Sequence, residues 1–276
     1  MAEVNGYSLE QFCDELESLV SREQDIGLFL PEAQSLLKKL LPNRDFVGDV
    51  LAKMVADDAF LKGSIGTIDR NDIILYLSSR GSFSMRLFTW MPSVTYPIHD
   101  HGSWGIMGGY ASDTGETRYR RLDDGLDENR AQLEGTGQGI IHTGETGSVH
   151  PFGIHRMYST NDQVSLTVHV YGRALRKGYV QRFNRQSGSQ YNVGKLITPK
   201  LEKRIFAVRA LGAIGGDAAA GNIEKAFRDA HPLVRWESLL AMEKVNRDTW
   251  QTLLKEASND ASPELSRKAG AALDKL

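Results

Sequence analysis

Cysteine is scarce in this chain. Cys13 is the only cysteine among 276 residues, and there are seven histidines. A single cysteine excludes an intrachain disulfide and any zinc cluster built from several cysteines. A chain without disulfides is typical of a reducing compartment, so we expect a cytoplasmic protein.

Long apolar runs and a strong charge of either sign are also missing. No apolar run approaches the roughly 18 residues of a membrane span, and the N-terminus has no basic segment followed by an apolar one. The formal net charge is −2, with 41% hydrophobic and 25% charged residues. These values predict a globular protein that binds neither nucleic acid nor membranes.

The spacing of apolar residues divides the chain into three parts. Residues 1–65 have helical spacing, residues 66–186 contain short runs rich in β-branched and aromatic residues, and residues 196–276 are helical again. We interpret the polar stretch NRQSGSQYNVG, residues 184–194, as a linker. We therefore expect N-terminal helices packed on a small β barrel or sandwich, followed by an all-α domain.

The C-terminal helical part repeats itself. Similar frames begin at Arg204, Arg235 and Arg267, each with small residues on the following turns. A helical repeat of this length is typical of stacked helix pairs and resembles short HEAT-type repeats. Such surfaces mostly bind proteins, so we expect a protein partner or self-association through this tail. The alternative is an ordinary helical bundle.

Two histidines lie two residues apart in the glycine-rich run YPIHDHGSWGIMGGY, residues 96–110. On a strand, His99 and His101 would point to one face, where two neutral imidazoles favour a transition-metal site. The alternative is a pair of surface histidines on a loop. A firmly held metal needs at least one more protein ligand. The candidates for it are His142, His150, His155, His169 and Glu145.

The stretch SVHPFGIHRMYSTND, residues 148–162, favours His155 as the third ligand. Together with the earlier pair of histidines, it resembles the two motifs of the cupin superfamily, whose members are β jelly rolls. Many cupins carry a glutamate shortly after the second histidine, but residues 102–106 contain no carboxylate. The resemblance therefore implies a metal site of three histidines, His99, His101 and His155.

Within the cupins, residues 70–184 resemble the thiol dioxygenases, such as cysteine dioxygenase and 3-mercaptopropionate dioxygenase. The run SLTVHVYG places Thr167, His169 and Tyr171 at alternate positions, where this family carries a hydrogen-bonded Ser-His-Tyr triad. On a strand, Thr167 would orient His169, and His169 would hold the Tyr171 hydroxyl near the metal. The alternative is that His169 is a core histidine satisfied by a neighbour.

The resemblance also implies a cofactor and a reaction. A non-haem Fe(II) ion would bind a small thiol carboxylate such as cysteine or 3-mercaptopropionate, and dioxygen would convert the thiol to its sulfinate. Three histidines accept other metals too, so iron follows from the resemblance alone. Two alternatives remain open: a metal cupin acting on a carbon substrate, and a ligand-sensing cupin whose HEAT-like tail docks a protein.

An arginine binds the substrate carboxylate in this family, because its planar fork suits bidentate pairing. The resemblance points to Arg182 and Arg70, which lie near the positions used in two subfamilies, and Arg86 is a further candidate. Trp104 is expected either to line the substrate pocket or to fill the core. Cys13 lies too far upstream for the cysteine–tyrosine crosslink of animal members.

Overall fold

The computed structural model describes residues 6–176 and 178–276. Its contacts divide the chain into two compact units, each assembled from two segments. Unit 1 consists of Met1–Phe46 and Gly66–Ile197, and unit 2 of Val47–Ile65 and Thr198–Leu276. The sequence-based division, which kept all of residues 1–65 with the barrel, differs from this one. Within unit 2, Arg204 bonds to Asp58, which ties the inserted segment to the C-terminal helices.

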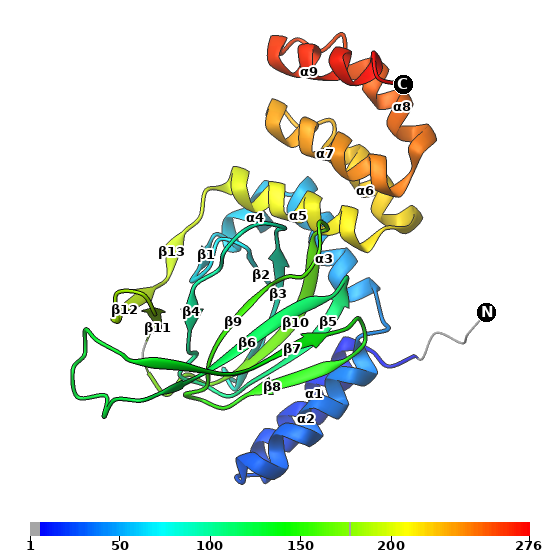
Figure 1. Cartoon of the computed structure of the whole chain (residues 1–276). Coiled ribbons are helices and arrows are strands. Elements are labelled where there is room, and N and C mark those ends of the chain that lie inside the picture. The colour runs from blue at the N-terminus through cyan, green and yellow to red at the C-terminus, as the bar shows by residue number, and fades with distance from the viewer. Residues whose placement is uncertain (1–5, 177) are drawn as a thin grey trace. The chain divides into compact units, whose positions relative to one another are not determined.

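Two antiparallel sheets form the β-sandwich of unit 1, as the sequence predicted for this region (Figure 1). The five-stranded sheet has the order β2 (Asp72–Leu77), β3 (Phe83–Trp90), β10 (Ser165–Gly172), β5 (Gly105–Ala111) and β8 (Thr146–Val149). The six-stranded sheet has the order β12 (Ser189–Gly194), β11 (Tyr179–Asn184), β4 (Ile98–His99), β9 (Ile154–Ser159), β6 (Thr114–Arg121) and β7 (Leu133–Ile141). A separate two-stranded sheet pairs β1 (Gly66–Thr67) with β13 (Leu196–Ile197).

The stretch interpreted as a linker is not one. Its residues form the turn and second strand of a hairpin, in which β12 pairs with β11 from Ser189 to Gly194. β12 is the outermost strand of its sheet, and most of its side chains are exposed or half-buried. An exposed edge strand carries polar residues, so its composition resembles that of a loop.

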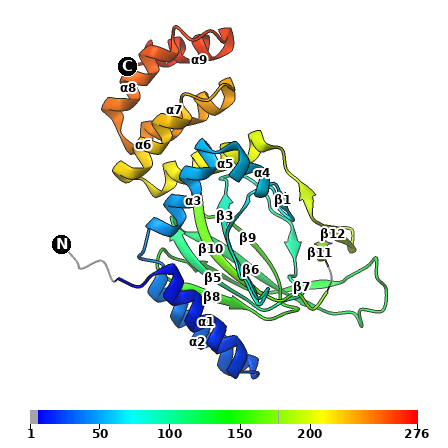
Figure 2. The same cartoon turned by 180° about the vertical axis from the view of Figure 1, so that it is seen from behind.

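The N-terminal helices α1 (Leu9–Arg22) and α2 (Ile26–Leu40) belong to unit 1. Ser8 and Gln11 form the capping box expected from the sequence pattern at the start of α1. The ring of Phe12 packs edge-on against Phe83 of β3, with 6.5 Å between ring centroids. Figure 2 shows α2 beside β5 and β8. The single cysteine, Cys13, is buried in α1.

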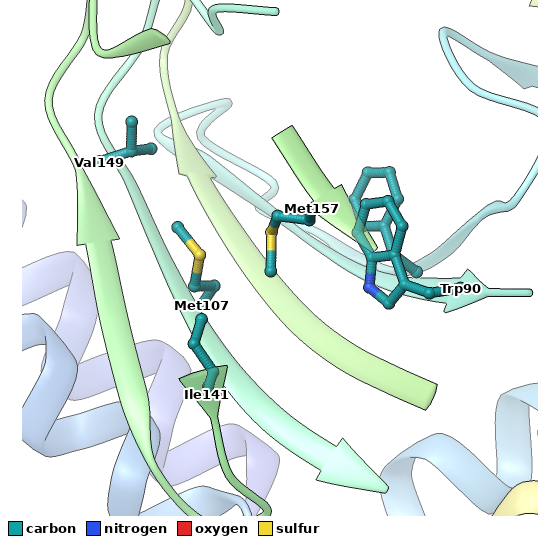
Figure 3. Packing of buried hydrophobic residues seen from close by; sticks show 6 residues of the cluster. Trp90, Met107, Ile141, Val149 and Met157 are labelled. Atoms are coloured by element: carbon teal, nitrogen blue, oxygen red, sulfur yellow. The ribbon is translucent and has the colours of Figure 1, made fainter. Parts of the chain in front are cut away.

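Apolar side chains fill the interior of the sandwich (Figure 3). The cluster consists of Phe88, Trp90, Met107, Ile141, Val149 and Met157. Phe88 and Trp90 stack at 5.4 Å between ring centroids, and Tyr171 packs against the cluster from its edge. Burial of such large side chains stabilises a domain by roughly 1.5–3 kcal/mol each. Through Met157 of β9 and Tyr171 of β10, this core contacts two of the strands that carry the three histidines and their neighbours.

Unit 2 is all helical in its described residues. It contains most of α3 (Asp45–Ala56), then α4 (Asp58–Gly63), α5 (Lys200–Ile214), α6 (Gly216–Ala226), α7 (Pro232–Val245), α8 (Arg247–Ala257) and α9 (Pro263–Leu273). Helices at both ends of the chain were expected from the sequence. In the part of the chain that the structure describes, the helices are too short or too polar to cross a membrane.

Candidate metal centre

Three histidine side chains meet in unit 1. His99 of β4 lies opposite His155 of β9 in the antiparallel pairing, and His101 follows two residues after His99. One ring nitrogen from each histidine lies within 4.8 Å of the other two. The Nε2 atoms of His101 and His155 are 2.8 Å apart. The three residues that the sequence motifs singled out therefore converge on one point.

The local structure that positions His101 differs from the one expected. β4 ends at His99, so the two histidines are not alternate residues of one strand. Between them, Asp100 accepts hydrogen bonds from the Arg176 guanidinium and from the backbone N–H of Gln181, the latter at 3.0 Å. Gly102 follows with φ +61°, a backbone conformation that favours glycine. The hydrogen bonds of Asp100 and the turn at Gly102 orient the ring of His101 toward those of His99 and His155.

Hydrogen bonds at Nδ1 orient two of the three imidazoles. Nδ1 of His99 donates to the carbonyl oxygen of Pro97 at 3.1 Å, and Nδ1 of His155 donates to Oε1 of Glu116 at 2.7 Å. These partners assign the protons to Nδ1 and leave Nε2 as the lone-pair nitrogen. The lone pairs can then face the space that the three rings share.

The ring nitrogens have the chemistry and spacing of metal ligands. Burial, and then the nearby His155, lower the pKa of His99 to about 3, and burial lowers the pKa of His101 well below its usual value. Both rings are therefore neutral at pH 7, as ligands must be. Nitrogen–metal bonds of about 2.0–2.1 Å at right angles put two nitrogens about 2.9 Å apart. The 2.8 Å between His101 and His155 fits such a site.

Glu116 on β6 supports His155 from behind. β6 and β9 are antiparallel neighbours, and Arg118 lies directly opposite His155, so Glu116 is its diagonal neighbour. Burial alone would raise the pKa of Glu116, but its hydrogen bonds to His155 and Arg118 outweigh burial and lower it. The charged carboxylate holds the ring of His155 and increases the basicity of its Nε2. Glu116 was not among the site residues expected from the sequence.

A chain of hydrogen bonds runs along β10 toward the three histidines. Nε1 of Trp90 donates to Oγ1 of Thr167 at 2.8 Å. Oγ1 of Thr167 lies 2.7 Å from Nε2 of His169, and Nδ1 of His169 lies 2.7 Å from the Tyr171 hydroxyl. The alternation of these three residues along one strand brings them to one face, as the sequence predicted.

The indole of Trp90 sets the direction of this chain, because an indole N–H can only donate. Thr167 accepts from Trp90 and can give its own proton to Nε2 of His169. A neutral His169 then carries its proton on Nδ1 and donates it to the Tyr171 oxygen. Burial lowers the pKa of His169 well below its usual value, which keeps the ring neutral. The Tyr171 proton is thus left to point elsewhere.

Tyr171 lies directly against the metal-ligand candidates. Its ring stacks on His101 with 4.6 Å between centroids and 28° between planes. Burial raises the pKa of Tyr171 well above its usual value, and the carboxylates of Asp72 and Asp69 add to this effect. Gly105 on neighbouring β5 leaves room for the ring, because a Cβ there would lie 3.0 Å from it. Tyr171 is therefore a protonated phenol beside the site.

A cavity of about 150 Å³ opens beside His99, His101 and Tyr171. Its volume is below the roughly 300–1,000 Å³ of typical drug-sized sites, so it suits a small ligand. Its charged lining residues, other than histidine, are Asp69, Asp72 and Arg86. Nη1 of Arg86 lies 2.5 Å from Oδ2 of Asp72, which is almost fully buried.

The three expected substrate-binding residues lie in different places. Arg182 is opposite His99 in the β11–β4 pairing, and its guanidinium donates to Asp69. Arg70 is exposed on the turn before β2. The ring of Trp104 packs against Phe29 of α2 at 4.6 Å between centroids. The described residues that line the cavity include Arg86 but none of these three.

The remaining candidate ligands lie outside the cluster. His142 is exposed, with Nδ1 3.0 Å from Oδ2 of Asp113, and His150 is exposed after β8. Glu145 is also exposed, and His169 belongs to the hydrogen-bonded chain on β10. Of the residues that the structure describes, His99, His101 and His155 are the one group of at least three potential ligands that meets the spacing for a metal ion.

No protein-family model matches the chain, but parts of it are similar to solved structures. The DMSP lyase DddQ from Ruegeria pomeroyi DSS-3 is 14% identical over 35% of this chain and 41% of the lyase, with a TM-score of 0.27. An RmlC-like cupin protein from Ralstonia eutropha JMP134 is 11% identical over 44% of this chain and 65% of that protein, with a TM-score of 0.29. A cupin family protein from Methanocaldococcus jannaschii, with a double-stranded β-helix fold, is 9% identical over 38% of this chain and 83% of its own length, with a TM-score of 0.28. Each of these three matches covers less than half of this chain.

Proposed function

We propose that the chain is a cupin thiol dioxygenase that uses Fe(II) to oxidise a small thiol carboxylate, such as cysteine or 3-mercaptopropionate, to its sulfinate. When bound, the iron would hold the thiolate and dioxygen side by side, and both oxygen atoms would go to sulfur, which loses four electrons to dioxygen. His99, His101 and His155 would be the ligands, and three neutral imidazoles leave positions open for both reactants.

The observation that carries this proposal is the hydrogen-bonded series Thr167–His169–Tyr171 ending beside His101. Tyr171 is aimed and kept protonated, so its hydroxyl serves as a proton donor at the open side of the site. A buried tyrosine held by a neutral histidine has no evident purpose in a site that merely stores a metal. Arg86, which lines the cavity, is the arginine that we assign to the substrate carboxylate.

The experiment is oxygen uptake by Fe(II)-loaded protein with cysteine and 3-mercaptopropionate, with sulfinate identified by mass spectrometry. Tyr171→Phe removes one hydroxyl, so metal content and thiol affinity are expected to stay close to wild type. Loss of a proton donor commonly costs about 100-fold to 10,000-fold in rate. Unchanged sulfinate formation in Tyr171→Phe, or oxidation of a carbon substrate in place of the thiols, would contradict the proposal.

We further propose that α5 to α9 are HEAT-type repeats that dock a protein or a second copy of the chain. Arg204 of α5 donates to Asp229 at 2.7 Å, and Arg235 of α7 lies 2.7 Å from Asp260. Both pairs join residues 25 apart, as a structural repeat requires. A groove of about 450 Å³ with an apolar and basic lining, which includes half-exposed Leu240, lies along α7 to α9.

Sedimentation of the full chain at increasing concentration tests the self-association arm of this second proposal. A Leu240→Glu variant places a charge in the groove and is expected to abolish association without changing metal content. A chain that stays monomeric at every concentration would leave a different protein as the docking partner, and the same variant would then be compared in binding to it.

A further inference from the structure

One loop of unit 1 carries a marked excess of negative charge. Residues 122–132, LDDGLDENRAQ, join β6 to β7 and extend past the ends of both strands (Figure 1). This β6–β7 loop has four acidic residues and one basic residue, so its formal charge is −3, whereas that of the whole chain is −2. An exposed segment with this charge attracts basic surfaces and repels acidic ones.

The same loop holds a leucine in water. The side chain of Leu126 is 82% exposed, the highest value among the large apolar residues of the described chain. Hydrogen bonds hold the loop around it: Oδ1 of Asp123 accepts from the backbone N–H of Gly125 at 2.9 Å, and Nε2 of Gln190 donates to the carbonyl oxygen of Glu128 at 2.8 Å. An apolar side chain on a loop that is already ordered loses little conformational freedom on binding, so Leu126 is suited to anchor a contact.

The groove along α7 to α9 in unit 2 complements this loop in both respects. Its described lining is apolar with four basic residues and one acidic residue, namely Arg247, Arg267, Lys268, Lys275 and Glu243. The ammonium of Lys268 lies over the ring of Trp236, at 5.6 Å from the centroid. The guanidinium of Arg247 lies over the ring of Trp250 at 5.1 Å. Tryptophan and arginine are enriched among the residues that dominate protein interfaces, so the groove suits an apolar side chain with acidic neighbours.

We propose that the β6–β7 loop of one copy of the chain docks into the groove of a second copy, with Leu126 as the apolar anchor and the loop carboxylates facing the basic residues of the groove. This inference rests on the proposed docking role of α5 to α9 and names the partner as the chain itself. Every copy carries both surfaces. Because the loop belongs to unit 1 and the groove to unit 2, the contact is heterologous.

Two variants disable the two surfaces separately. Leu126→Lys removes the anchor and places a cation opposite the basic groove, whereas Leu240→Glu places a carboxylate where the acidic loop would bind. In sedimentation of the full chain, each protein alone is expected to associate at least about 100-fold more weakly than wild type. The matched control is Leu28→Lys, which changes another leucine of unit 1 that is 64% exposed on α2. This variant should associate like wild type.

A mixture of the two defective proteins tests the heterologous contact directly. The Leu240→Glu protein keeps an intact loop and the Leu126→Lys protein keeps an intact groove, so one complete contact can form between them. A 1:1 pair is therefore expected at concentrations where each protein alone is monomeric. Raising the salt concentration should dissociate this pair, because the opposing charges lie on exposed surfaces.

Three results would each overturn this contact. They are a wild-type chain that stays monomeric up to its solubility limit, a Leu126→Lys protein that associates as strongly as wild type, and a mixture that forms no pair. The first result leaves a different protein as the partner of the groove, and the second leaves self-association through another surface, so neither contradicts the proposed docking role of the tail. Sulfinate formation is assayed separately, and its absence would contradict the proposed oxidation without affecting this contact.

Discussion

Oε1 of Glu116 lies 2.7 Å from Nδ1 of His155, and both side chains are almost fully buried. The glutamate comes from β6 and the histidine from β9, so the pairing of these two strands builds part of the candidate metal centre. The carboxylate fixes which nitrogen of His155 carries the proton, and therefore which one is available as a ligand.

Replacing Glu116 by glutamine is therefore expected to weaken metal binding without removing a ligand. The amide keeps the shape and loses the charge, and loss of such a supporting group typically costs about 10-fold to 100-fold in metal affinity. Equilibrium competition with a coloured chelator measures this change. The matched control is Glu134→Gln, which alters an exposed glutamate of β7 that is paired with Arg120 of β6. This variant should bind metal like wild type.

His155 itself should be indispensable for tight binding. His155→Ala leaves two imidazoles, which are too few to hold the ion firmly, so metal is expected to be lost on gel filtration. His150→Ala removes an exposed histidine five residues earlier and is expected to retain a full equivalent. Metal analysis of both purified proteins decides the matter, and the reverse pattern would show that the second motif was assigned to the wrong histidine.

Thr167 should affect the rate and leave the metal untouched. Thr167→Val removes the hydroxyl that lies between Trp90 and His169, so His169 loses the partner that sets its proton on Nδ1. We expect kcat to fall about 10-fold to 100-fold, as for other supporting groups, with little change in KM or metal content. Thr167→Ser keeps the hydroxyl and should restore most of the activity. Equal rates in the valine and serine variants would show that the hydroxyl has no role.

Burial of a neutral His169 should make folding stability depend on pH. Its pKa in the folded protein lies well below the value of about 6.5 in the unfolded chain, so the unfolded state binds more protons between these two values. Stability is therefore full above about pH 6.5 and falls as the pH decreases below it, by up to about 1.4 kcal/mol per pH unit for this residue. Urea unfolding of metal-free wild type and His169→Gln at pH 7 and pH 5 measures the difference. A pH dependence equally steep in the variant would exclude His169 as its source.

The parts of the candidate metal centre that depend on short-range spacing could be predicted from the sequence. Alternation along one strand was enough to place Thr167, His169 and Tyr171 on one face. The resemblance of two short motifs to those of cupins was enough to predict that His155 lies beside His99 and His101. Helices at both ends and β structure between them followed from periodicity.

Groups that depend on strand pairing could not be found in this way. Glu116 supports His155 only because β6 pairs with β9 in one register, and the sequence around it, TGETRYRR, shows nothing more than an alternating strand. Asp72 meets Arg86 across the pairing of β2 with β3. Registers between strands are set by tertiary packing, so a single sequence does not reveal which acid meets which base.

Because Cys13 is buried, the thiol of the protein itself is not expected to be oxidised in the proposed reaction. Its thiol is enclosed in α1, and burial raises its pKa to about 11, so little thiolate forms at neutral pH. The chain has no other cysteine to oxidise. In a reaction run under ¹⁸O₂, sulfur-bound label should therefore appear in the small-molecule fraction, and the intact mass of the protein should show no sulfinic acid adduct.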